Sequence, residues 1–256
     1  VQKYQEQAKN IEGAEFGPEE QVWPGAKKRR VRILQKHATY AAMVEKMDQA
    51  VGKVLNKLTE LGIEKETIIC FTSDNGGLST SEGSPTSNLP LRGGKGWVYE
   101  GGIREPFIIK YPSIINAGIS DVPVISTDFY PTILELAKID QRPEQHLDGI
   151  SLVTVLKDPK SNPKRDSLYW HYPHYSNQGG FPGGAIREGK MKLIERYEDG
   201  RIHLFDLNND PGERNDIAEM HPKTVLSMRT KLHKWYKQVN AKFLQPKGSN
   251  IDPWKP

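Results

Sequence analysis

The chain has 256 residues, which is enough for one large domain or for two, with a substantial core. Its 36 lysines and arginines exceed its 32 aspartates and glutamates by only four, so we expect no nucleic-acid partner. A single cysteine excludes an internal disulfide and a cysteine metal cluster, and no run of 18 apolar residues is present that could span a membrane.

The first part of the chain is polar up to about residue 36, and the segment PEEQVWPG within it is predicted to be a surface loop. The chain begins with valine and shows no charged-then-apolar signal region, so we expect a mature chain or a piece of a longer one. From Ala38 onward apolar residues recur in steps of three and four, which predicts a helix that ends at Gly62. These residues are Tyr40, Val44, Met47, Val51, Val54, Leu55, Leu58 and Leu61.

Two short apolar segments after this helix are predicted to be strands. The first, Thr67–Thr72, is expected to be buried and is followed by a glycine-rich segment, and the second is Phe107–Tyr111. Ser126-Thr127-Asp128 can cap a further helix that runs to about Lys138. Because strands and helices alternate, the sequence predicts an α/β domain with a largely parallel sheet between helices.

The character of the sequence changes after about residue 155. A linker at residues 157–164 precedes four short predicted strands, and turns at Gly189 and Gly200 join the last three as hairpins. A final helix carries Val225, Met228, Leu232 and Trp235 on one face. We therefore divide the chain into residues 1–155, part of an α/β domain, and residues 156–256, a small antiparallel sheet with one helix.

Asp74 and Asn75 follow the first predicted strand directly. In open α/β sheets ligands bind at the carboxyl ends of strands. A carboxylate and a carboxamide offer hard oxygen donors, which favour Ca²⁺ and, less strongly, Mg²⁺ over zinc. The alternative interpretation is an ordinary turn, because Asp, Asn and Gly are the residues that turns prefer.

Lys95 lies among glycines in Gly93-Gly94-Lys95-Gly96, where small residues allow an anion to approach backbone N–H groups. The segment is not a phosphate-binding P-loop, because no Ser or Thr follows the lysine. A glycine-rich surface turn with a solvated lysine is the alternative. Nearby Arg92 could bind an anion or pair with an acid, and Arg104 is expected to pair with Glu100 or Glu105.

These segments together resemble the type I, formylglycine-dependent sulfatases of the alkaline phosphatase superfamily. That family has a strand ending in (S/A)DNG followed by PLRxGKxxxxEGGxRxP, and this chain reads SDNGG and then PLRGGKGWVYEGGIREP. The similarity extends to four further stretches: YAAMVEKMDQAVGKVL, STDFYPTILELA, LDG and LFDLNNDPGE. The resemblance implies an alkaline phosphatase-like mixed or parallel sheet between helices.

The resemblance also implies roles for matching residues. Asp74 and Asn75 correspond to two ligands of the family's Ca²⁺, and Lys95 to the lysine that holds the sulfate. In such enzymes a cysteine in Cys-x-(Pro/Ala)-x-Arg becomes formylglycine, whose hydrate attacks sulfur. Cys70 is followed by Phe-Thr-Ser-Asp and does not match, so we interpret it as an inert core thiol. His37 is not at the place of the family's sulfate-binding histidine and is expected to lie at the surface or cap a helix.

The chain is therefore expected to be the C-terminal half of a sulfatase, incomplete without an N-terminal half that carries the formylglycine. Family resemblance alone places such a protein in the periplasm or outside the cell and favours a bacterial origin. The segment LYWHYPHY adds aromatic rings and two histidines, His171 and His174, that could bind a sugar. The alternative is that His171 merely alternates with Tyr169 along a strand edge.

Three functional classes remain open. The first is hydrolysis of sulfate esters, on a sulfated carbohydrate, by the complete protein. The second is a phosphoesterase or phosphonate hydrolase of the same superfamily, against which the PLRGGK and EGGxR motifs argue. The third is a protein without activity that binds anionic glycans through Lys95, Arg92 and its basic surface.

Overall fold

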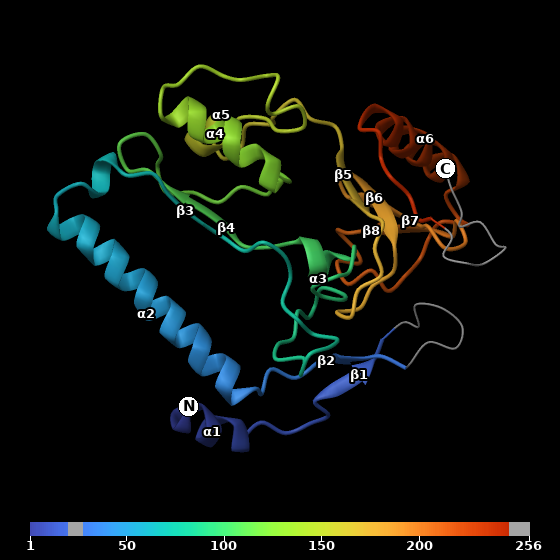
Figure 1. Ribbon diagram of the computed structural model, residues 1–256, viewed down its shortest axis with the longest axis horizontal. Helices are drawn as coiled ribbons and strands as arrows, with labels where there is room; N and C mark the ends of the chain where they lie inside the picture. Colours follow the sequence, from blue (N-terminus) through green and yellow to red (C-terminus); the bar gives the residue numbers. More distant parts are fainter. Residues whose placement is uncertain (20–27, 246–256) are drawn as a thin grey trace. The chain divides into compact units, whose positions relative to one another are not determined.

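The computed structural model describes residues 1–19 and 28–245 (Figure 1). Contacts group the chain into two compact units: Val1–Lys46, Ser73–Glu105 and Ser167–Pro256 form the first, and Met47–Thr72 and Pro106–Asp166 form the second. This grouping crosses the boundary at residue 155 that the sequence indicated, and that division stays a prediction. Most of the segment PEEQVWPG lies outside the described residues.

The polar N-terminal segment of the first unit contains more regular structure than its sequence indicated. Helix α1 (Gln2–Lys9) precedes strands β1 (Phe16–Pro18) and β2 (Arg30–Arg32), which pair antiparallel. The backbone N–H of Arg32 donates to the carbonyl of Ser79, at 2.8 Å. This bond ties the N-terminal segment to the glycine-rich segment that carries the candidate site.

The last part of the first unit is an antiparallel sheet of four strands with one helix, as predicted (Figure 1). Its order is β5–β6–β7–β8, and helix α6 packs against β6 and β7. The strands are β5 (Leu168–Tyr172), β6 (Gly183–Glu188), β7 (Met191–Arg196) and β8 (Ile202–Asp206), and α6 is Pro222–Gln238. Gly189 and Gly200, both with positive φ, lie in the two connecting turns.

The side chains of these strands point alternately to the two faces of the sheet and form a hydrophobic core on each face. One face of the sheet packs against Met228 and Leu232 of α6, and both of these side chains are buried as the sequence predicted. The other face packs against Trp97 and Tyr99, which belong to the glycine-rich segment. Since side chains of a strand point alternately to the two faces, the same three hairpin strands serve both cores.

Helix α2 (Ala38–Glu60) has the bounds that the apolar periodicity predicted, and Gly62 follows it with φ of +68°. The Nδ1 atom of His37 accepts the N–H of Tyr40 at 3.1 Å, so His37 caps the helix as expected. Within the described residues only Ala42 of this helix is buried. Its apolar face is largely exposed, with Met43, Met47, Val54 and the following Leu61 all more than half accessible.

In the second unit, β3 (Ile69–Thr72) pairs antiparallel with β4 (Phe107–Lys110), whereas the sequence favoured parallel pairing. A parallel pair needs a crossover that is usually helical. Here the connecting segment contains only one helical turn, α3 (Glu100–Ile103). The expectation that the first strand is buried is also wrong, because its residues are half-buried or exposed, and a two-stranded ribbon covers little of its own surface.

The other elements of the second unit are helical. They are η1 (Glu64–Glu66), η2 (Ser126–Asp128), α4 (Phe129–Leu136) and α5 (Val153–Lys157). The buried carboxylate of Asp128 accepts the N–H of Ile125 at 3.0 Å, which caps this helical start as predicted, and it also pairs with Arg165. No helix in residues 1–19 or 28–245 is long and apolar enough to cross a membrane.

Candidate active site

Three glycine-containing segments of the first unit are joined by backbone hydrogen bonds around α3. The N–H of Gly76 donates to the carbonyl of Gly102 at 3.1 Å, and the N–H of Gly101 donates to that of Arg92 at 2.8 Å. The N–H of Lys95 donates to the carbonyl of Gly77 at 3.2 Å. The turn that carries Asp74 and Asn75 and the turn that carries Lys95 therefore share one scaffold.

The glycines of this scaffold are needed for contact between backbones. A Cβ atom at Gly94 would lie 2.3 Å from the carbonyl oxygen of Gly77, and one at Gly76 would lie 1.8 Å from that of Gly101. Both distances are far below van der Waals contact. Close backbone packing therefore requires glycine at position 94. The sequence did not reveal this requirement, and predicted only that a glycine here would let an anion approach the backbone.

We expect Gly94→Ala to destabilise the protein by about 2 kcal/mol or more, because the added methyl group meets fixed backbone on a closely packed scaffold. Gly52→Ala is the matched control, since a Cβ at Gly52 of α2 meets nothing within 4 Å. In a helix that change is expected to stabilise by roughly 0.5–1 kcal/mol. Urea unfolding curves of the two variants measure the difference, and equal midpoints would contradict the packing argument.

Asp74 and Asn75 present oxygen atoms that the described residues leave available. Asp74 is exposed and Asn75 half-buried, and no hydrogen bond or ion pair engages either side chain among residues 1–19 and 28–245. Burial raises the pKa of the nearby Glu105 carboxyl, and the charge of Asp74 raises it further. The carboxylate of Asp74 and the amide oxygen of Asn75 are hard oxygen donors, which fit Ca²⁺ or Mg²⁺.

These two side chains can supply only part of a coordination shell. In the described part of the chain no three His, Cys, Asp or Glu side chains are grouped so that they could hold a metal ion. Ca²⁺ takes six to eight oxygen ligands, so further donors would have to come from other groups or water. The metal-binding role of Asp74 and Asn75 stays a prediction that their geometry allows.

The ammonium group of Lys95 is also available. Its side chain is half-buried, and among the described residues it makes no hydrogen bond or ion pair. Its backbone, in contrast, is fixed by the bond to Gly77 and by neighbouring glycines with positive φ, Gly93 and Gly96. A fixed backbone with an uncommitted cation is the arrangement that an anion-binding lysine needs.

Arg92 lies in the same turn but is engaged by the protein. Its Nε atom donates to Glu19 at 3.2 Å, another nitrogen donates to the carbonyl of Glu213 at 3.0 Å, and its guanidinium covers the ring of Tyr99. These contacts favour a structural role, and contact of Arg92 with a substrate stays a prediction. Arg104 lies 3.9 Å from Glu100, so the expected pairing with an acid is present but loose.

A buried cluster of charges behind this turn was missed by sequence reasoning. Lys192 of β7 lies between Glu100 and Glu213, 2.9 and 2.8 Å from their carboxylates, and all three side chains are at most 2% exposed. A lysine inside the apolar strand Met191–Arg196 was the available signal, because lysine is almost never fully buried unless it is paired.

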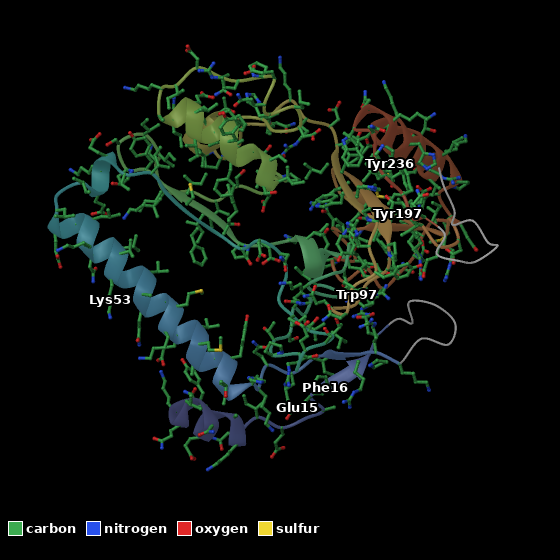
Figure 2. All side chains as sticks on the ribbon, in the orientation of Figure 1. Glu15, Phe16, Lys53, Trp97, Tyr197 and Tyr236 are labelled. Carbon is green, nitrogen blue, oxygen red and sulfur yellow. The ribbon has the colours of Figure 1, made fainter. Side chains whose placement is uncertain are left out.

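His174 lies in a loop that contacts the Lys95 turn. The Oγ1 atom of Thr80 donates to the carbonyl of Gln178 at 2.6 Å and accepts the indole N–H of Trp97 at 3.0 Å (Trp97 is labelled in Figure 2). A Cβ atom at Gly96 would lie 3.0 Å from Ser176 of the same loop. His174 itself is exposed, so a substrate-binding role near Lys95 remains open to it.

His171, in contrast to the exposed His174, lies in the core between the sheet and α6. Its Nε2 atom lies 2.8 Å from the carbonyl of Lys242 and its Nδ1 atom 2.6 Å from the Tyr197 hydroxyl. The Tyr197 hydroxyl is 2.9 Å from that of Tyr236, and Figure 2 labels both tyrosines. Because a carbonyl only accepts, Nε2 of a neutral His171 carries the proton, and Nδ1 is the acceptor nitrogen beside the Tyr197 hydroxyl. This environment supports the structural alternative, and substrate binding by His171 stays an untested prediction.

The buried position of His171 has a consequence for pH. Burial lowers the pKa of His171 below its ordinary 6.5, so the unfolded chain takes up a proton before the folded one does. Stability from this residue is therefore full above about pH 6.5 and declines as the pH falls through the folded pKa. We expect urea midpoints measured between pH 7.5 and 5.5 to fall less in His171→Phe than in the wild type, and an equal fall would contradict a neutral buried ring.

Comparison with known proteins completes the description of the site. Residues 2–139 match the family described as Sulfatase, and residues 94–242 match the family described as N-sulphoglucosamine sulphohydrolase, C-terminal. A sulfatase of Formosa agariphila is 37% identical over 227 residues, which cover 80% of this chain and 40% of that protein. The chain thus spans about two fifths of the length of this curated relative.

Solved structures with the same fold include two with bound sugars. The structure of Ps i-CgsB in complex with k-i-k-neocarrahexaose is 32% identical with a TM-score of 0.69, and the match covers 79% of this chain and 44% of that one. A protein in complex with its substrate D-glucosamine-2-N,6-O-disulfate is 29% identical with a TM-score of 0.68, covering 79% and 40%. These likenesses confirm the predicted fold class, and together with the matched family descriptions they show that the chain belongs to the sulfatase family.

Proposed function

We propose that the complete protein hydrolyses sulfate esters of a carbohydrate, and that this chain supplies part of its active site. One observation carries the proposal. The Lys95 ammonium and the oxygens of Asp74 and Asn75 are uncommitted within the described residues, yet the backbones of Lys95 and of Gly76, next to Asn75, are hydrogen-bonded into the scaffold around α3. An uncommitted cation and uncommitted oxygen donors on one rigid scaffold suit a sulfate group and a metal ion.

In this proposal Lys95 binds a sulfate oxygen and stabilises the negative charge that develops during transfer of the sulfuryl group. Asp74 and Asn75 would hold Ca²⁺, or less well Mg²⁺, through hard oxygen donors. A bound Ca²⁺ supplies charge neutralisation at the sulfate oxygens. Arg92 holds the Lys95 turn through Glu19 and Glu213, and its contact with the substrate stays a prediction.

A sulfated carbohydrate is proposed as the substrate because of the loop beside Lys95. That loop exposes His174 and Tyr175, and rings with polar tips bind sugar faces and hydroxyls. The two structures named above hold sugars, which supports the same class of substrate without fixing the sugar. We propose further that the formylglycine lies in an N-terminal half outside this chain, and that the protein works in the periplasm or outside the cell.

The experiment compares the complete protein with the 256-residue chain on 4-nitrophenyl sulfate in the presence and absence of calcium. We expect calcium-dependent hydrolysis by the complete protein and none by the chain alone, because Cys70 does not lie in the formylglycine motif. Hydrolysis by the chain alone would refute the proposal that the active site is divided between this chain and an N-terminal half. Hydrolysis of an aryl phosphate but not a sulfate would indicate the related phosphoesterases, and glycan binding without turnover would indicate a binding protein.

A further inference from the structure

The buried cluster of Lys192, Glu100 and Glu213 is unusual because it places two carboxylates and an ammonium out of water. Arg187, 3.5 Å from Glu100, adds a second positive charge, so the cluster is close to neutral. Burying ion pairs costs desolvation that often cancels the attraction between the charges. Stability alone is therefore a weak account of these residues, and their contacts with the backbone provide a better one.

Glu213 forms two hydrogen bonds with the scaffold around α3. One oxygen of its carboxylate accepts the N–H of Glu100, at 2.5 Å, at the start of α3, and its carbonyl accepts the guanidinium of Arg92. Its φ of +51° is uncommon for a residue other than glycine, and such a conformation persists where the surroundings hold it. Lys192 forms an ion pair with the other oxygen, at 2.8 Å, which opposes rotation of the carboxylate away from α3.

Helix α3 in turn holds both halves of the candidate site. The carbonyl of Gly102 accepts the N–H of Gly76, next to Asn75, and the N–H of Gly101 donates to the carbonyl of Arg92, three residues before Lys95. A shift of α3 would therefore change the position of the Asp74–Asn75 turn relative to Lys95. Displacements of about 1 Å at reacting groups can cost about 100-fold in rate.

We infer that Glu213 and Lys192 are positioning residues, which set the distance between the metal-binding turn and Lys95 by holding α3. This inference rests on the proposed function. Neither side chain reaches a substrate, since both are fully buried. Their effect passes through backbone contacts to Gly76 and Arg92.

The test uses the complete protein with Glu213→Ala, Glu213→Gln and the matched control Glu195→Ala. Glu195 lies on β7, as Lys192 does, and is 0% exposed, but it pairs with Arg229 and His233 of α6, and within the described residues no hydrogen bond or ion pair joins its side chain to α3. We measure kcat and KM for 4-nitrophenyl sulfate, and the calcium concentration that gives half of the calcium-induced rise in Tm. The Tm series reports calcium binding independently of turnover.

For Glu213→Ala we expect kcat to fall by about tenfold to 100-fold and the half-saturating calcium concentration to rise by about tenfold. Glu213→Gln retains an oxygen for the Glu100 N–H, so its losses are expected to be smaller, about threefold. Glu195→Ala is expected to lower Tm in the absence of calcium while keeping kcat and calcium dependence.

Equal kcat and calcium dependence in Glu213→Ala and Glu195→Ala would overturn the inference and leave Glu213 a structural residue. If Glu213→Ala fails to fold, Glu213→Gln is compared with Glu195→Gln, and identical values in that pair overturn the inference as well. Wild-type protein that binds calcium without hydrolysing the sulfate would remove the proposed function alone, and the calcium series would still decide the role of Glu213.

Discussion

Replacing Lys95 by alanine in the complete protein is expected to lower kcat for 4-nitrophenyl sulfate by about 10²- to 10³-fold, the usual cost of removing one group that stabilises a developing oxyanion. Folding should be nearly unaffected. The side chain is half-buried and, in the described part of the chain, its ammonium has no protein partner to lose. Changes at such positions usually alter the free energy of unfolding by less than about 0.5 kcal/mol.

The matched control is Lys237→Ala, an exposed lysine near the end of α6. It removes the same charge from the protein at a distance from the scaffold, so it separates a local effect from a change in net charge. We expect its kcat to equal that of the wild type. A Lys95→Ala enzyme with unchanged kcat would remove Lys95 from the site, and a large fall in Tm would assign it to the fold instead.

Much of the fold could be predicted because its elements are specified by local patterns. The steps of three and four apolar residues placed α2 and α6, and glycines with positive φ marked the turns of the hairpins. The pairing of β3 with β4 could not be predicted in the same way, because both directions bury the same side chains locally. Only the absence of a crossover helix between them decides for the antiparallel arrangement.

The candidate site was predictable to a similar degree. Motifs located Asp74, Asn75 and Lys95, but the contacts that fix them join residues far apart in the chain. Glu213 reaches Glu100 across 113 positions, and no local pattern reports such a pairing. His171 shows the opposite case, because it shares a strand face with Tyr169, and the period of two along this strand already offered a structural alternative to sugar binding.

The second large effect is expected at the turn of Asp74 and Asn75, which we propose binds a metal ion. Asp74→Ala should raise the half-saturating calcium concentration of the complete protein at least about tenfold, because it removes the charged side chain that we propose as a ligand. Asn75→Ala removes a neutral ligand and should have a smaller effect in the same direction. Since a ligand stabilises by RT ln(1 + [L]/Kd), a tenfold weaker site lowers the calcium-induced gain in stability by about 1.4 kcal/mol at high calcium.

Asp74→Asn separates the contribution of the negative charge of Asp74 to calcium affinity from the contribution of its oxygen donor. The amide keeps an oxygen donor but loses the negative charge, so its calcium affinity should lie between those of the wild type and Asp74→Ala. Asp121→Asn, at an exposed position in the second unit, controls for the change in net charge. Because the Asp74 charge also raises the pKa of Glu105, the neutral amide in Asp74→Asn should lower that pKa when calcium is absent. Equal calcium affinity in Asp74→Ala and Asp121→Asn would refute a metal-binding role and favour the ordinary turn.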